Sequence, residues 1–320
     1  SVSMKLDSIF KLCVEEGIKV DPRGKAKVEK ILKKRSETYK KRDKKDTSYF
    51  DKQTLWNPFD DSRILVNDGK NIKTVIIGID METPELLLAS ELNRQGKKID
   101  AVWSHHPEGT ALIGLDKVMA MQADTLAGAG VPINQAEAIM AGRIKEVFEG
   151  LSPQNAERIE QAAKLLGINY LNTHTPADNH VHTFLTNLFE KKKPETLGEI
   201  IKILEALPEY KNGIKQKIGP TLFVGSPDSS CGKIYVDMTG GTNSNKEAYK
   251  KLADSGVGTI VGMHVGKEMK KEAEKNHMNI VIAGHIPSDN LGMNLMLDKV
   301  EKKTKLKIIE ASGFRRVKRK

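Results

Sequence analysis

Three short motifs hold four of the eight histidines in the chain and combine them with carboxylates. SHHP contributes His105 and His106, and the hexapeptides HTPADN and HIPSDN begin at His174 and His285. Both hexapeptides read histidine, any residue, proline, a small residue, aspartate, asparagine. One such hexapeptide would be explained by turn hydrogen bonds and helix capping. Neither role requires the same spacing twice, so the repeat indicates a site built from imidazoles and carboxylates.

The two aspartates of the hexapeptides are Asp178 and Asp289. Imidazoles and carboxylates that converge on one crevice are typical of a divalent-metal site. Each motif follows an apolar segment with the pattern of a buried β-strand, namely IDAVWS, INYLNT or NIVIAG. Ligands of open α/β sheets bind beyond the carboxyl ends of such strands. Because proline restricts the backbone, we expect the histidines and aspartates to be presented from stiff loops.

The adjacency of His105 and His106 raises a geometric problem, because successive side chains of a strand point to opposite faces. At a strand end followed by Pro107, the two rings need not diverge so far. The two rings also need not bind the same ion, because a site with two ions requires neighbouring ligands that point to slightly different positions. The pair therefore favours a site with more than one ion.

Strand and helix patterns alternate along most of the chain, which predicts an α/β fold. TVIIGID and IDAVWS, with the helical TPELLLASELNRQGKK between them, form a β-α-β unit that implies parallel strands and a right-handed crossover. We expect a helical, Lys-rich extension over 1–70, a first α/β half over 71–192 and a second α/β half with a basic tail over 193–320. The sheets should be mixed or parallel, with the metal site in the crevice between the halves.

The composition is that of a soluble globular protein, with 38% hydrophobic and 29% charged residues among 320. No window approaches the roughly 18 consecutive apolar residues of a membrane span. Cys13 and Cys231 are too few and too isolated for a disulfide framework or a thiolate metal site. We therefore expect a cytoplasmic protein without a membrane partner.

The net charge of +10 comes from segments near the two ends of the chain. Residues 19–46 contain 13 lysines and arginines against 5 acidic residues, and residues 302–320 contain 9 against 1. Lysine-rich runs are usually solvated helix faces or tails, and the tail FRRVKRK offers only Phe314 for base stacking. Nucleic acid is therefore not an expected partner, although binding through the basic ends stays open as a third hypothesis.

Two further features carry weaker signals. The Gly-rich MTGGTNSNKE lies between a strand and a helix, where backbone N–H groups can hold an anion such as a substrate phosphate, although many such turns bind nothing. Of the remaining histidines, His180 and His182 lie at a predicted helix start, and His264 and His277 lack the pattern of the hexapeptides. We interpret these four as structural or surface residues: His180, His182, His264 and His277.

The motifs in combination resemble the NIF-three-like family (NGG-one-interacting factor three), hexameric proteins with a dinuclear metal centre that are often labelled GTP cyclohydrolase I type 2. TVIIGIDMETPELLLASELNRQGKKIDAVWSHHP is similar to the family's opening β-α-β unit, and VGMHVGKEMKKEAEKNHMNIVIAGH to its last strand-helix-strand unit. GPTLFVGSPDSSCGKIYVDMTGGT resembles its second-half entry. The resemblance covers about residues 55–310 and implies the family's fold, two metal ions and a toroidal hexamer.

Carried over residue by residue, the resemblance implies that His105 and His285 bind one ion and that His106 and Asp178 bind the other. Asp289 would bridge both ions. The family usually has glutamate there, and aspartate is shorter by one methylene. Either the ions lie closer to this segment, or the bridge is lost and one ion is held weakly.

This ligand set leaves coordination positions for water. Water between two dications about 3.5–4 Å apart is acidified enough to act as a hydroxide nucleophile near neutral pH. His174 would line the site as the candidate catalytic residue, holding that water or a substrate group. The mixture of nitrogen and oxygen donors suits zinc, iron or manganese better than magnesium or calcium. We expect zinc.

The leading hypothesis is a metal-dependent hydrolase of cyclohydrolase or phosphoesterase type, acting on a small molecule such as a nucleotide. No feature of the sequence selects guanine. The alternative is a non-enzymatic protein that handles metal, or regulates a partner, as a metal-stabilised hexameric ring.

Overall fold

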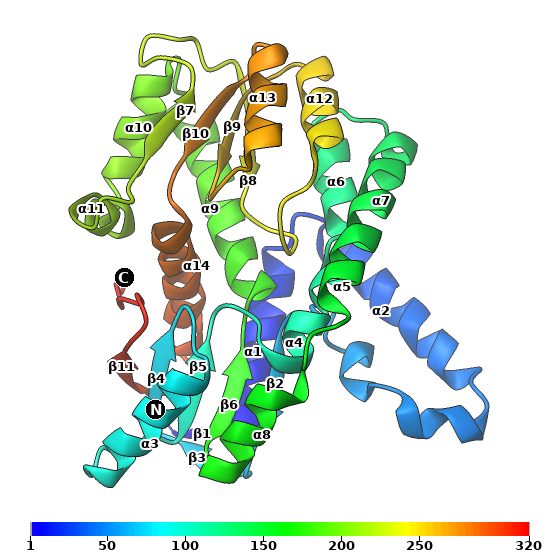
Figure 1. Ribbon diagram of the computed structural model, residues 1–320, viewed down its shortest axis with the longest axis vertical. Helices are drawn as coiled ribbons and strands as arrows, with labels where there is room; N and C mark the ends of the chain where they lie inside the picture. The colour runs from blue at the N-terminus through cyan, green and yellow to red at the C-terminus, as the bar shows by residue number, and fades with distance from the viewer. Residues whose placement is uncertain (1, 320) are drawn as a thin grey trace.

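A computed structural model describes residues 2–319 of the chain (Figure 1). Within this range two main β-sheets lie at opposite ends of the molecule. Helices α9 (Thr175–Lys192) and α14 (His285–Val300) pack against each other and run between the sheets. Both sheets are mixed and mostly parallel, so the predicted α/β class with two α/β halves is confirmed.

The first sheet has five strands, of which only β2 is antiparallel to its neighbour. In spatial order they are β11 (Lys307–Glu310), β4 (Thr74–Gly78), β5 (Ala101–Ser104), β6 (Asn169–Asn172) and β2 (Arg63–Val66). The parallel arrangement of β4, β5 and β6 directs their carboxyl ends to one edge of the sheet. That edge faces the second sheet in Figure 1.

Helices cover both faces of the first sheet. Ile77 and Trp103 enter the core on one face, and the intervening Ile76 and Val102 enter the core on the other, as the alternation of strand side chains requires. Four helices complete these cores: α1 (Leu6–Lys19) and α14 on the first face, α3 (Thr83–Arg94) and α8 (Glu157–Leu166) on the second.

The second sheet has four strands, and β8 lies at one edge because it pairs only with β9. In spatial order they are β7 (Thr221–Val224), β10 (Asn279–Ile282), β9 (Val257–Gly262) and β8 (Lys233–Asp237), with β7 antiparallel to β10. A separate antiparallel pair joins β1 (Met4–Lys5) to β3 (Asn71–Ile72).

Helices also cover both faces of the second sheet. One face packs against α9, α10 (Leu197–Glu205) and α11 (Pro208–Lys215). The other packs against α6 (Met121–Gly128), α7 (Ile133–Leu151), α12 (Lys246–Asp254) and α13 (Lys267–Lys275). The short α4 (Gly109–Ile113) and α5 (Leu115–Val118) link β5 to α6. Nowhere in residues 2–319 does a helix combine the length and hydropathy that crossing a membrane requires.

The hexapeptides HTPADN and HIPSDN do not form the stiff loops that we expected. His174 caps the start of α9, and His285 is the first residue of α14, so both prolines lie in a first helical turn. A proline costs little there, because the first N–H groups of a helix have no partner within it. A helix also places residues i and i+4 on one face. The spacing of histidine and aspartate therefore reflects a helix and not a loop.

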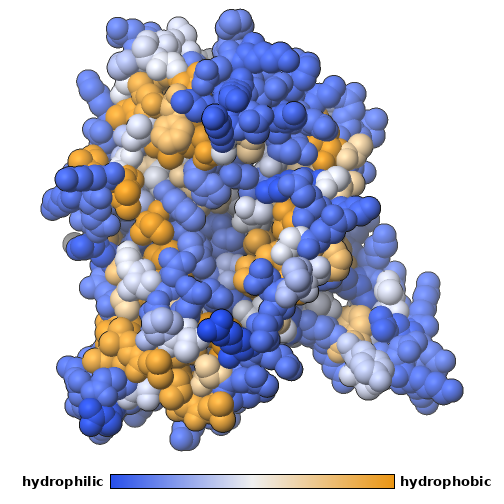
Figure 2. Space-filling view, viewed as in Figure 1, coloured by the Kyte–Doolittle hydropathy of each residue, from blue (hydrophilic) through white to orange (hydrophobic). Residues whose placement is uncertain are grey.

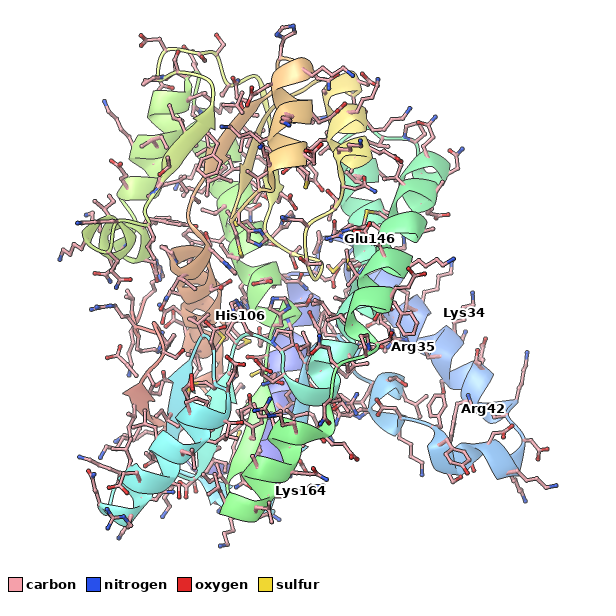
Figure 3. The ribbon with its side chains drawn as sticks, in the orientation of Figure 1. Lys34, Arg35, Arg42, His106, Glu146 and Lys164 are labelled. Atoms are coloured by element: carbon pink, nitrogen blue, oxygen red, sulfur yellow. The ribbon has the colours of Figure 1, made fainter. Side chains whose placement is uncertain are left out.

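Sheet membership crosses the boundaries expected from the sequence. β2 belongs to the N-terminal 70 residues, where we expected a helical extension, yet it pairs with β6 of the first sheet. β11 lies near the C-terminus, yet it pairs with β4 of the first sheet. Only α2 (Lys25–Lys40) and the 3-10 turns after it, η1 (Lys44–Tyr49) and η2 (Lys52–Leu55), extend from the body as a basic arm that carries Lys34 and Arg42 (Figures 1 and 3).

The basic C-terminal segment folds back onto the body. Arg316 pairs with Asp298 at 2.8 Å and with Glu301 at 2.9 Å. Arg319 forms a two-pronged ion pair with the buried carboxylate of Glu209. Because acidic groups of the body neutralise these cations, the segment is not a free polybasic tail.

The contact between α9 and α14 depends on a glycine. A Cβ atom at Gly292 would lie 2.5 Å from the carbonyl oxygen of Ala177. We predict that Gly292→Ala lowers the free energy of unfolding by about 1–3 kcal/mol, because the two helices must separate. A Cβ atom added at Gly142, in the exposed part of α7, has no neighbour within 4 Å. Gly142→Ala should therefore raise the free energy of unfolding by about 0.5–1 kcal/mol. Urea unfolding measures both, and equal effects would contradict the proposed contact.

Candidate metal centre

The two adjacent histidines continue the first sheet beyond the end of β5. The backbone N–H groups of His105 and His106 donate to the carbonyl oxygens of Gly78 and Ile79 at 3.0 and 2.8 Å. Both rings nevertheless reach one group: Nε2 of His105 lies 3.0 Å from Oδ1 of Asp289, and Nε2 of His106 lies 2.9 Å from Oδ2. The two rings thus address the two oxygens of one carboxylate, which matches the expectation of ligands aimed at neighbouring points.

Helix α9 brings a histidine and an aspartate to the same place. Nε2 of His174 lies 3.3 Å from Oδ2 of Asp178, and Oδ1 of Asp178 lies 3.3 Å from Nε2 of His105. One donor atom from each of these three buried residues lies within 4.8 Å of the others. Such a cluster is compact enough to hold one metal ion.

Helix α14 supplies the same pair of residue types from the second half of the chain. Nε2 of His285 lies 3.2 Å from both Oδ2 of Asp289 and Nε2 of His106. His105, His106 and Asp289 form a second group with donor atoms within 4.8 Å of one another. Together with His285, the two clusters bring together all six residues that the sequence selected, and His105 belongs to both clusters.

The grouping differs from the pairing that the family resemblance implied. His285 lies beside His106 and not beside His105, and Asp178 lies beside His105 and His174. The i, i+4 geometry explains this, because each helix keeps its own histidine and aspartate together.

Hydrogen bonds hold the other nitrogen of three of the rings. Nδ1 of His105 lies 3.0 Å from the carbonyl oxygen of Thr173. Nδ1 of His174 lies 2.7 Å from the buried carboxylate of Asp61, and Nδ1 of His106 lies 2.5 Å from the carboxylate of Asp80. Such partners fix the ring orientation and strengthen the free nitrogen as a metal ligand.

The sequence reasoning missed Asp61 and Asp80. Asp80 follows β4 closely, so the rule that polar residues at strand ends line the site could have found it. Asp61 precedes the edge strand β2, and no local signal identifies it. His264, which we interpreted as structural or surface, is exposed, and its ring lies 4.8 Å from the ring of His285, next to the site.

The burial of the site is uneven. The side chain of His105 is fully buried and that of His174 is 10% exposed, whereas those of His285 and Asp80 are 40% and 50% exposed. The cluster therefore opens to solvent on the side of His285 and Asp80. Figure 3 places His106 near the middle of the molecule, between the two sheets.

Comparisons with known proteins bear on the fold. No family model and no curated protein matches the chain. Among solved structures, a NIF3 superfamily protein from Sphaerobacter thermophilus matches with a TM-score of 0.70 and 26% identity, over 79% of this chain and 91% of that chain. The chain has a NIF3-like fold.

Two further solved structures are more distant. Reduced HcgD from Methanocaldococcus jannaschii has a TM-score of 0.47 and 15% identity, over 77% of this chain and 87% of its own. TTHA1606 from Thermus thermophilus has a TM-score of 0.46 and 13% identity, over 79% of this chain and 89% of its own.

The electrostatics of the site suit a cation. Burial alone would lower the pKa values of His105 and His106, but the carboxylates around them raise the first well above its usual value and the second to about 9. Burial would raise the pKa of Asp289, yet the surrounding histidines hold it well below its usual value. Oδ1 of Asp178 is buried, and its 3.3 Å contact with Nε2 of His105 lacks the geometry of a hydrogen bond. Positive charge is thus favoured among these groups, and one carboxylate oxygen is left for a cation.

We predict a pH-dependent stability in the metal-stripped protein. A pKa of about 9 for His106 in the folded state, against 6.5 for the free side chain, means that its protonation stabilises the fold fully below pH 6.5 and that this effect is lost as the pH rises through 9. Urea unfolding after chelation should show a free energy of unfolding that falls over this interval. The fall should be weaker in Asp289→Asn, and an unchanged fall would contradict the assigned pairing.

Proposed function

We propose that the chain binds two divalent metal ions at this cluster and acts as a metal-dependent hydrolase of cyclohydrolase or phosphoesterase type. The observation that carries the proposal is the pair of overlapping His/Asp clusters, each with donor atoms within 4.8 Å. Histidines and aspartates on a protein surface are usually scattered and exposed to solvent. In the two clusters, the histidines and aspartates are mostly buried, and further hydrogen bonds hold them in place.

The contacts suggest how the residues divide between the ions. A single Nε2 atom can bind only one ion, so His105 joins His174 and Asp178 at the first position, while His106 joins His285 at the second. The two oxygens of Asp289 face His105 and His106, which suits a carboxylate that bridges both positions. In this arrangement the shorter side chain of aspartate suffices, and His174, our candidate catalytic residue, becomes a ligand.

The donor set decides the kind of ion that we propose. Imidazole nitrogens outnumber carboxylates, which favours zinc, with iron or manganese as alternatives, over the all-oxygen sites of magnesium and calcium. When bound, two such ions would polarise a substrate and acidify a water molecule for hydrolysis.

The chain's own residues would bind and orient the substrate on the open side of the site. His264 lies there beside His285, and burial together with the nearby His285 lowers its pKa, so it is a neutral donor or acceptor. Nδ1 of His264 lies 3.0 Å from Nδ2 of Asn243, which follows the Gly-rich turn. A small molecule, such as a nucleotide, would therefore enter between this turn and Asp80.

A non-enzymatic role in metal handling or regulation is the second candidate, since the same cluster serves it. We also propose a homo-oligomer, as the family resemblance implies a hexamer. Exposed leucines on α3 and α8, Leu87, Leu88 and Leu165, lie on helices that pack together, and Figure 2 shows apolar surface at this end of the molecule. The two free, buried cysteines support a cytoplasmic location.

Metal content tests the binding proposal. Protein purified without added metal should carry about two transition-metal ions per chain by mass spectrometry. His105→Ala and Asp289→Asn should each reduce the content to fewer than one, because these residues contact both clusters. The exposed His277→Asn serves as the control and should keep both ions. Fewer than one ion in the unchanged protein, after reconstitution with zinc, iron and manganese, would refute the proposal.

Turnover separates the two candidate functions. Metal-loaded protein should hydrolyse at least one member of a panel of nucleotides, phosphodiesters and cyclic amidines. Asp178→Asn should lower that rate at least 100-fold, because removing a metal ligand disturbs the charge that the reaction requires. Retained metal without any turnover would favour the metal-handling role.

A further inference from the structure

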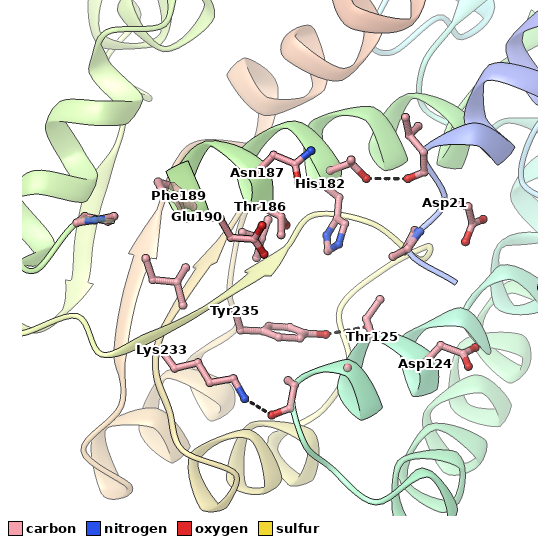
Figure 4. A pocket seen from close by; sticks show the side chains of 18 of the residues that line it. Asp21, Asp124, Thr125, His182, Thr186, Asn187, Phe189, Glu190, Lys233 and Tyr235 are labelled. Carbon is pink, nitrogen blue, oxygen red and sulfur yellow. Dashed lines mark hydrogen bonds between the residues drawn. The ribbon is translucent and has the colours of Figure 1, made fainter. Parts of the chain in front are cut away.

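A cavity lies apart from the metal centre, at the open edge of the second sheet. It has a volume of about 740 Å³ and is enclosed by the second half of α9, the edge strand β8, the end of α6 and the turn after α1 (Figure 4). None of the candidate metal ligands lines it. This volume falls in the range of pockets that bind small molecules.

Flat side chains form part of the cavity wall. The ring of Tyr235 lies across the floor, and its hydroxyl is held by the hydroxyl of Thr125 at 2.8 Å. Figure 4 shows the imidazole of His182 on the opposite side, projecting from α9 toward the cavity. Phe189 of α9 adds a buried apolar wall. A planar ring fits such a space better than a flexible chain does, because it can stack on Tyr235.

Two polar atoms in this wall have no hydrogen-bond partner among the described residues. They are Nδ1 of His182 and Oγ1 of Thr186, which lie one turn apart on α9. Burial lowers the pKa of His182 to about 4, so its ring is neutral at physiological pH and donates or accepts a hydrogen bond. Buried polar atoms are rarely left unpaired in folded proteins. Both residues line the cavity, so a change of rotamer would present either polar atom to a ligand there.

The charges around the cavity leave a small positive excess. Asp21 is neutralised by Arg23, and Asp124 pairs with Lys27, so neither acid needs a ligand cation. Lys19 pairs with Glu16 at 2.9 Å.

At the end of α9, Lys193 lines the cavity together with Glu190, and Lys233 reaches into it from β8 to donate to the carbonyl oxygen of Ala129. Neither lysine has a carboxylate partner among the described residues. The two lysines against one glutamate favour an anionic group at this side of the cavity.

We propose that this cavity binds a small molecule made of a planar heteroaromatic ring and one anionic group, as in a mononucleotide. The ring stacks on Tyr235, and its edge pairs with His182 and Thr186. The anionic group lies near Lys193 and Lys233. The site is independent of the metal centre, although α9 carries parts of both.

A binding assay with defined probes tests this proposal. Ligand-observed NMR and calorimetry on the full chain, with AMP, GMP, CMP, UMP and FMN as probes, should show at least one dissociation constant below about 1 mM. Thr186→Val keeps the shape of the side chain and should weaken that binding about tenfold. Lys193→Ala should weaken it by a similar factor. Lys192→Ala, at the neighbouring position outside the cavity lining, is the matched control and should leave it unchanged.

Further readouts distinguish this site from the metal centre. Asp178→Asn should leave the binding of the probe unchanged, whereas lost binding would place the probe at the metal centre and overturn the proposal. Without ligand, Thr186→Val should unfold at the same or a higher temperature, because it removes an unpaired hydroxyl. A lower unfolding temperature would mean that the hydroxyl is already satisfied by the protein, which contradicts its assigned role. The absence of binding for all five probes would also overturn the proposal.

Discussion

The carboxylate of Asp289 is the group on which the candidate site depends. It is 1% exposed and contacts three imidazoles, two from the end of a strand in the first sheet and one from its own helix. A buried carboxylate is costly unless it is paired, so the histidines and the aspartate require one another. Because α14 follows β10 of the second sheet, this contact also ties the two halves of the fold together.

The packing of α9 against α14 sets the geometry of that contact. Each helix begins directly after the carboxyl end of a parallel strand, and each carries a histidine and an aspartate one turn apart. The close approach at Gly292 and Ala177 brings the two first turns together on the histidines that follow β5. Two similar hexapeptides thus occupy similar places at the ends of two different sheets. Both hexapeptides direct their histidine and aspartate toward the same space, where they form one cluster.

Helix α9 connects regions with different chemistry. Its first turn holds two candidate ligands, and its second half lines the cavity at the edge of β8. In the first region imidazoles surround carboxylates and hydrogen bonds are nearly complete. In the second, polar atoms remain unpaired among the described residues and His182 stays neutral. This contrast separates a site suited to a cation from one suited to a neutral ring with an anionic group.

The sequence by itself determined the fold class, the β-α-β unit around β4 and β5, and the six residues that gather at the site, because apolar periodicity and motif spacing are local. It misjudged the first turns of α9 and α14, since a proline permits either a loop or a helix start. Only the tertiary structure decided that β2 and β11 join the first sheet, that Asp61, Asp80 and His264 reach the site, and which histidine faces which aspartate. These outcomes depend on contacts between residues far apart in the chain, such as His174 with Asp61, for which local pattern carries no information.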